Sequence, residues 1–218
     1  MTRLPWGRVV LAAAAALAFV SCSSTYYKAL ETFGVEKRDV LVSRVEAAKG
    51  AQENAQEQFR DALEQFQALV GYDGGDLEEL YDRLSDEYDD SVSRADAVRD
   101  RIASVKKVGE DLFREWEREL DEYSDANLRR KSQSQMNGTR RDYDQLVAKM
   151  EKAAGRMDPV LTTMKDHVLF LKHNLNARAL GSLEETADTL QRDVNRLIKD
   201  MEAAISEADK FISSVSSD

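Results

Sequence analysis

Apolar residues return at alternating steps of four and three along most of this chain. Such steps bring side chains to one face of an α-helix, and their alternation is typical of helices that pack lengthwise against one another. Between residues 35 and 70 the pattern is unbroken and has one polar member, Gln52. Its positions are Leu41, Val45, Ala48, Gln52, Ala55, Phe59, Ala62, Phe66 and Leu69. We predict one long helix over residues 35–70.

Two further stretches carry the same pattern. Residues 77–120 hold it at Leu77, Tyr81, Leu84, Tyr88, Ser91, Ala95, Val98, Ile102, Val105, Gly109, Leu112 and Trp116. A third stretch, beginning near Leu128, holds it at Tyr143, Leu146, Met150, Ala153, Met157, Val160, Met164, Val168, Leu171 and Leu175. Pro159 removes one helical hydrogen bond, but the pattern keeps its phase across it, which favours a kinked continuous helix over a true break.

A fourth stretch begins after Gly181, where Ser182 and Glu185 have the spacing of an N-terminal capping box. Its apolar positions are Leu183, Ala187, Leu190, Val194, Leu197, Met201, Ala204, Ala208 and Phe211. We predict that Gly181 ends the third helix, that the fourth runs to about Ser213, and that residues 214–218 form a flexible tail.

Short polar segments separate the four stretches. The glycines in residues 71–75 (GYDGG) indicate the first chain reversal, and residues 121–127 (DEYSDAN) the second. Long helices joined by short connections predict an all-α fold, an elongated antiparallel four-helix bundle or coiled coil over residues 35–213. Residues 160–180 are the most apolar stretch of the mature chain, and residues 168–171 (VLFL) within it are apolar on more than one helical face. We therefore expect residues 160–180 at the centre of the bundle.

The start of the chain has the three parts of a secretory signal: Arg3 and Arg8, an apolar run over residues 9–20, and the small residue Ser21. That run is shorter than the roughly 20 residues of a membrane-spanning helix. Cys22 follows directly and is the only cysteine. The segment resembles the acylation site of bacterial lipoproteins, although Phe19 stands where Leu is usual. We expect a signal peptide over residues 1–21; an ordinary signal with a spare thiol is the alternative.

Lipid attached to Cys22 would leave residues 22–34 as a tether between the membrane and the helices. Ser23, rather than Asp, follows the cysteine, and in lipoproteins of two-membrane bacteria this implies transport to the outer membrane. The expected location is therefore the outer membrane, facing the periplasm. The net charge is −10, and it becomes −12 once Arg3 and Arg8 are removed with the signal. So acidic a chain is not expected to bind nucleic acid.

Charge is distributed unevenly along the helices. Residues 73–90 carry nine acidic and one basic side chain, whereas residues 127–156 carry eight basic and three acidic ones. An anchor at Cys22 places the second chain reversal towards the membrane, where anionic headgroups attract basic side chains. The hypothesis is a membrane contact, and a solvated helix face is the alternative. The residues concerned are Arg129, Arg130, Lys131, Arg140 and Arg141.

Candidate chemistry is sparse. The two histidines, His167 and His173, lie six residues apart and so on different helix faces, whereas helical metal-binding pairs lie three or four apart. His173, Asn174 and Asn176 form a polar patch beside the apolar run, which we interpret mainly as side chains that satisfy one another or water. Phosphate loops and nucleophile motifs are missing from the sequence. We expect no metal, no cofactor and no enzymatic activity.

Several short segments together resemble a bacterial family, domain of unknown function 2959. They are residues 34–39 (GVEKRD), 74–77 (GGDL), 115–117 (EWE), 128–130 (LRR) and 168–177 (VLFLKHNLNA). The last is the most specific, and the likeness extends from about Tyr26 to Ile212. The resemblance implies a helical envelope protein and supplies no catalytic residues.

We interpret the chain as a membrane-anchored periplasmic coiled-coil lipoprotein that acts as a structural or protein-interaction module with an envelope protein partner. The alternative is a lipid carrier or chaperone-like binder whose bundle opens around its cargo. Four methionines on the third helix would suit such an adaptable surface, although filling a core is their usual role. They are Met136, Met150, Met157 and Met164.

Overall fold

The computed structural model describes residues 36–70, 77–174 and 177–216, with only the backbone of 177–182 and 185. These residues form four α-helices and no strand, which confirms the all-α prediction. The helices are α3 (Lys37–Val70), α4 (Leu77–Glu119), α5 (Ala126–His173) and α6 (Ala177–Ser216). None of these helices is long and apolar enough to cross a membrane.

Internal contacts divide the chain into two units, Met1–Val40 and Leu41–Asp218, and the second holds nearly all of the helices. The predictions for the signal peptide, Cys22, the tether and the reversal at residues 71–75 lie outside the described residues.

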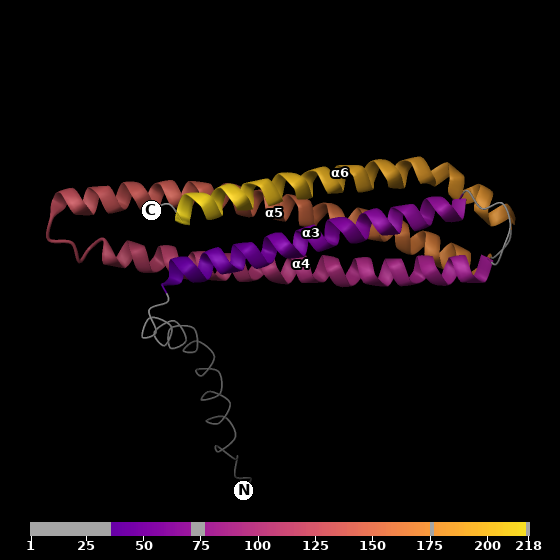
Figure 1. Ribbon diagram of the computed structural model, residues 1–218, viewed down its shortest axis with the longest axis horizontal. Coiled ribbons are helices and arrows are strands. Elements are labelled where there is room, and N and C mark those ends of the chain that lie inside the picture. The colour runs from indigo at the N-terminus through magenta and orange to yellow at the C-terminus, as the bar shows by residue number, and fades with distance from the viewer. Residues whose placement is uncertain (1–35, 71–76, 175–176, 217–218) are drawn as a thin grey trace, which may run out of the picture. The chain divides into compact units, whose positions relative to one another are not determined.

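Within the second unit, helices that follow one another in sequence run in opposite directions (Figure 1). Along α4 and α5, the Arg99–Asp158 and Lys106–Glu151 ion pairs, both 2.6 Å, show the antiparallel register. Helix α5 packs extensively on both α4 and α6. Helix α3 is joined to α6 by the 2.6 Å contact between Lys49 Nζ and Asp209 Oδ1. The predicted antiparallel arrangement is therefore present among these helices.

The heptad pattern identifies most of the core. All nine predicted positions of α3 are buried, and so are the predicted positions of α5 from Tyr143 to Leu171. In α4 the buried face shifts by one residue after Gly109, so that Phe113 is buried while Leu112 and Trp116 are only half-buried. Helix α6 follows its predicted pattern closely, and Val215 extends it.

One polar side chain lies in this core without a described partner. Gln52 is fully buried, and neither its amide nitrogen nor its amide oxygen has a hydrogen bond. Buried Ser91, by contrast, donates to the carbonyl of Glu87, one turn earlier in its own helix, at 2.7 Å. Because an unsatisfied buried polar group is destabilising, Gln52 is a local weak point in the interior.

The prediction that residues 160–180 lie at the bundle centre is wrong for Leu169 and Phe170. Leu169 is 48% exposed and Phe170 38% exposed, whereas Val168 and Leu171 are buried. A helix turns about 100° per residue, so four consecutive side chains point in four directions and only those facing α3, α4 and α6 are covered. The end of α5 therefore presents two large apolar side chains to solvent.

The predicted boundary between the third and fourth helices is also wrong. Helix α5 ends at His173, and α6 already includes Gly181 and Ser182. Asn174 terminates α5, since its backbone N–H donates to the Leu171 carbonyl and its side-chain amide to the Phe170 carbonyl, at 3.0 and 2.9 Å. These bonds satisfy the last carbonyls of the helix. Helix α6 also continues to Ser216, three residues beyond the expected end.

The other boundaries follow the sequence more closely. Helix α5 is continuous through Pro159, as favoured. The reversal between α4 and α5 occupies residues 120–125, and α5 begins two residues earlier than expected. Asp125 is its N-cap, and its carboxylate accepts from the backbone N–H groups of Asn127 and Leu128 at 2.7 and 3.3 Å. This cap fixes where the chain turns back along α4.

Candidate functional site

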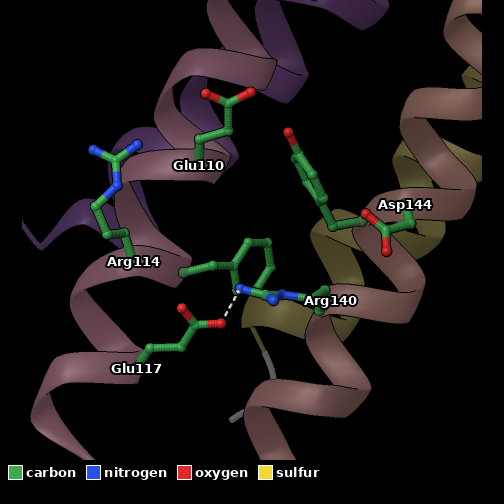
Figure 2. Close-up of a pocket in the computed structure, with 7 residues that line it drawn as sticks. Glu110, Arg114, Glu117, Arg140 and Asp144 are labelled. Carbon is green, nitrogen blue, oxygen red and sulfur yellow. Dashed lines mark ion pairs between the residues drawn. The ribbon is translucent and has the colours of Figure 1, made fainter.

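A groove lies between α4 and α5, near the end of α6 (Figure 2). Its volume is about 490 Å³. It is lined from α4 by Glu110, Phe113, Arg114 and Glu117, and from α5 by Arg140, Tyr143 and Asp144. The sequence reasoning noticed Arg140 and the apolar position of Tyr143 but did not bring these seven residues together.

The inner wall of the groove is aromatic. A Cβ added at Gly109 would overlap the ring of Tyr143, so this glycine allows the ring to lie directly on α4. Tyr143 meets Phe113 edge-on at 5.3 Å between ring centroids, and it donates to the Lys106 carbonyl at 3.4 Å. Burial raises the pKa of Tyr143 to about 12, aided by the nearby carboxylate of Glu110. The phenol therefore stays protonated at neutral pH and serves packing.

Arg140 closes one side of the groove. Its guanidinium lies 4.7 Å from the centroid of the Phe113 ring and forms a 2.9 Å ion pair with Glu117. Figure 2 shows Arg140 reaching across from α5 to α4. On the α4 side, Arg114 forms an ion pair with Asp111, with 3.1 Å between Nη1 and Oδ1. Both arginines of the groove are thus paired with carboxylates of α4, and its two rings are packed against each other.

The five basic residues proposed for membrane contact fall into two groups. Arg129 and Arg140 are each paired with an acid of the reversal or of α4: Asp121 Oδ1 at 2.6 Å for Arg129, and Glu117 for Arg140. Arg130 donates only to the Asn127 side chain, and Lys131 and Arg141 form no ion pair with any described residue. Part of the charge excess on α5 is therefore neutralised within the protein, and the membrane contact stays a prediction.

The predicted polar patch is only partly described. His173 is exposed, Asn174 ends α5 as noted above, and Asn176 lies outside the described residues. The bonds of Asn174 to its own helix account for its polar groups. The patch therefore has a structural explanation at the one position where its contacts are known.

His167 was not selected as a site residue, yet it is the more constrained histidine. It is buried, stacks on Phe66 with 4.7 Å between ring centroids, and its Nε2 lies 2.9 Å from Thr186 Oγ1. Thr186 Oγ1 also lies 3.0 Å from the Leu183 carbonyl oxygen. Burial lowers the pKa of His167. His167 lies three residues after Met164 and four before Leu171, and this heptad spacing predicts a core position for it.

Two carboxylates of α6, those of buried Glu207 and half-buried Asp200, bind basic side chains of α5. Lys149 donates to Glu207 at 2.5 Å, and this bond, outweighing burial, lowers the pKa of Glu207. Burial raises the pKa of Asp200, but the combined bonds from Lys152 and Arg156 outweigh it and lower the pKa. Among the described residues, no cluster of His, Cys, Asp and Glu has an arrangement that would hold a metal ion. The carboxylates instead align α6 with α5.

The four helices define an all-α helical bundle protein. Residues 26–215 match the profile of the family described as Protein of unknown function (DUF2959), and the chain belongs to that family. The resemblance seen in the sequence is thereby confirmed. Curated proteins gave no match, and neither did solved structures.

Proposed function

We propose that this chain is a lipid-anchored lipoprotein of the bacterial cell envelope, held in the outer membrane and facing the periplasm, where it acts as a structural or protein-interaction module. The observation that carries the proposal is the sequence Phe19-Val20-Ser21-Cys22 directly after an apolar run with a basic start. This order of residues provides both export and a thiol for acylation. Two or more acyl chains make attachment stable, whereas one alone is marginal.

The described helices support an interaction role. Their interior is filled by their own side chains, including Met136, Met150, Met157 and Met164, each at most 3% exposed. Charged groups and the exposed Leu169 and Phe170 lie on the outer faces instead. A chain built in this way offers a partner surfaces along its helices, while a carrier role would require the methionine-rich interior to open.

The anchor is tested by Cys22→Ser in the full chain, expressed in a two-membrane bacterium with labelled fatty acid. The variant should lose all label and leave the membrane fraction, because the oxygen of serine is not a substrate for thioether formation. Ser24→Ala is the matched control and should keep both. Label and membrane attachment that survive in Cys22→Ser would exclude the anchor.

The interaction role is tested with a photoreactive residue in place of exposed Leu169, in living cells. The expected result is one dominant protein adduct, identified by mass spectrometry. Adducts to many proteins, or to lipids, would contradict this role and favour the carrier or chaperone alternative.

A further inference from the structure

The α4–α5 hairpin extends beyond the other two helices at one end of the unit. Tyr143 of α5 faces Phe211 of α6, with 6.4 Å between ring centroids. From that level α6 continues for only five residues, to Ser216, whereas α5 reaches back seventeen, to Ala126. At 1.5 Å per residue the excess is about 18 Å. Figure 1 shows the connection between α4 and α5 lying well past the last turn of α6.

The unit begins at this same end. Lys49 pairs with Asp209, near the end of α6, so α3 enters the unit on the side from which the hairpin projects. Nineteen residues separate Leu41 from Cys22. A chain of that length spans at most about 65 Å, so this end, where the chain enters the unit, is the one tied directly to an anchor at Cys22. The inference therefore rests on the proposed function for its orientation.

The projecting end is apolar at its centre. Leu128 is 51% exposed and Tyr123 is 41% exposed. Leu128 continues the stripe of Ser132 and Met136, which are buried against α4, at steps of four residues. Because α4 ends at Glu119, the last member of that stripe lies past the end of the helix and is left half-exposed. The exposure thus follows from where the hairpin ends.

Charge beside these side chains is also suited to a lipid surface. Of the acids in the turn, Asp121 pairs with Arg129 and Asp125 accepts from the backbone of α5, while Glu122, beside Tyr123, has no ion pair with a described residue. Lys131 lies about one turn after Leu128 on the same side of α5, and Arg130 lies two residues after Leu128; neither has an ion pair with a described residue. Apolar side chains flanked by unpaired bases and an aromatic ring are the features that bind the interface of a bilayer.

We infer that the end of the α4–α5 hairpin, with Tyr123, Leu128, Arg130 and Lys131, is a second contact with the anionic lipid surface. The lipid at Cys22 attaches the chain, and the hairpin end sets how the helices stand on the membrane. Tyr123 and Leu128 enter the headgroup region, and Arg130 and Lys131 lie against the phosphates.

The test places a photoreactive residue at 128 or at 169 in the full chain, in bacterial membranes. The two leucines have nearly equal exposure, 51% and 48%, but lie about 60 Å apart along α5. Position 128 should give several-fold more phospholipid adduct than position 169. Equal yields, or mainly protein adducts at 128, would overturn the inference, and the latter would identify the hairpin end as a protein-docking site.

Charge variants refine the same measurement. Replacing Arg130 and Lys131 with Gln should lower the lipid adduct at 128 several-fold, whereas replacing the exposed Lys165 and Lys172, near the other end of α5, should leave it unchanged. An equal loss in both would contradict a local role for Arg130 and Lys131. Membrane attachment of Cys22→Ser is measured in a separate experiment. If the anchor is absent, that variant stays attached; if only the hairpin contact is absent, the lipid adduct at position 128 is no higher than at 169.

Discussion

At the scale of single residues, Gly109 decides how closely α4 and α5 approach. The ring of Tyr143 occupies the place where a side chain would be, and Phe113 and Arg140 are stacked outward from that ring. The heptad pattern marked Gly109 as inward-facing, but a one-dimensional pattern does not state which ring will fill the gap. Close approach at a glycine depends on the partner helix, which the sequence around Gly109 does not contain.

Gly109→Ala should therefore destabilise the protein by about 1–3 kcal/mol, because the new Cβ displaces Tyr143 from a packed position. Gly50→Ala is the matched control: nothing lies within 4 Å of an added Cβ there. That change should stabilise the helix by about 0.5–1 kcal/mol, since alanine loses less backbone entropy. Chemical denaturation of both variants measures the difference. Equal effects of the two substitutions would show that the contact between Gly109 and the Tyr143 ring does not contribute to the free energy of unfolding.

At the scale of helices, the sequence predicted the existence of all four and most of their buried faces. It failed at the junction of α5 and α6, where Ser182 and Glu185 suggested a start that the structure does not use. A capping box contributes about 1 kcal/mol, and one glycine inside a helix costs about as much. Such small local preferences are outweighed by burial of the α6 stripe, so boundaries are harder to predict than helices.

The groove was missed for a related reason. Glu110, Glu117 and Arg140 are ordinary charges on helix faces, and only the register of α4 against α5 brings them together. By contrast, the heptad spacing already contained Tyr143. Sequence patterns therefore predict which side chains are inside, but not which outer charges meet across two helices.

Pro159 provides a test at this scale. It is exposed within continuous α5, and the helix loses the hydrogen bond that its nitrogen would donate to the Gly155 carbonyl. Pro159→Ala restores that bond and should raise the free energy of unfolding by up to about 3 kcal/mol. Thermal melting followed by circular dichroism measures the change. A melting temperature that stays the same or falls would show that the surrounding helices require the proline geometry.

At the scale of the whole unit, stability should depend on pH in two separate windows. Burial lowers the pKa of His167 below its ordinary 6.5, so the unfolded chain takes up a proton first. Stability is then lost as the pH falls from about 6.5 towards the lower pKa of the folded state. Asp200 and Glu207 have lowered pKa values, and their contribution is lost only at pH values below the ordinary 3.8 and 4.5.

His167→Phe should remove the upper window, because the new ring still stacks on Phe66 but does not titrate. Exposed His173→Gln is the control and should retain it. Melting temperatures measured across both windows give the comparison. A pH dependence near neutrality that persists in His167→Phe would assign the effect to another group.

The apolar packing of α3 does not by itself fix its register against the neighbouring helices. The apolar stripe of α3 repeats every seven residues. If α3 moved by one heptad along its neighbours, most of its apolar residues would still face apolar residues of those helices. Gln52 makes no hydrogen bond that would prevent this movement. Polar contacts on the outer surface set the register of α3 against α6: Lys49 pairs with Asp209, and Arg60 and Gln56 both bind Glu202. Reversing the charges at those few surface positions would favour a neighbouring register of α3 and would leave the apolar core unchanged.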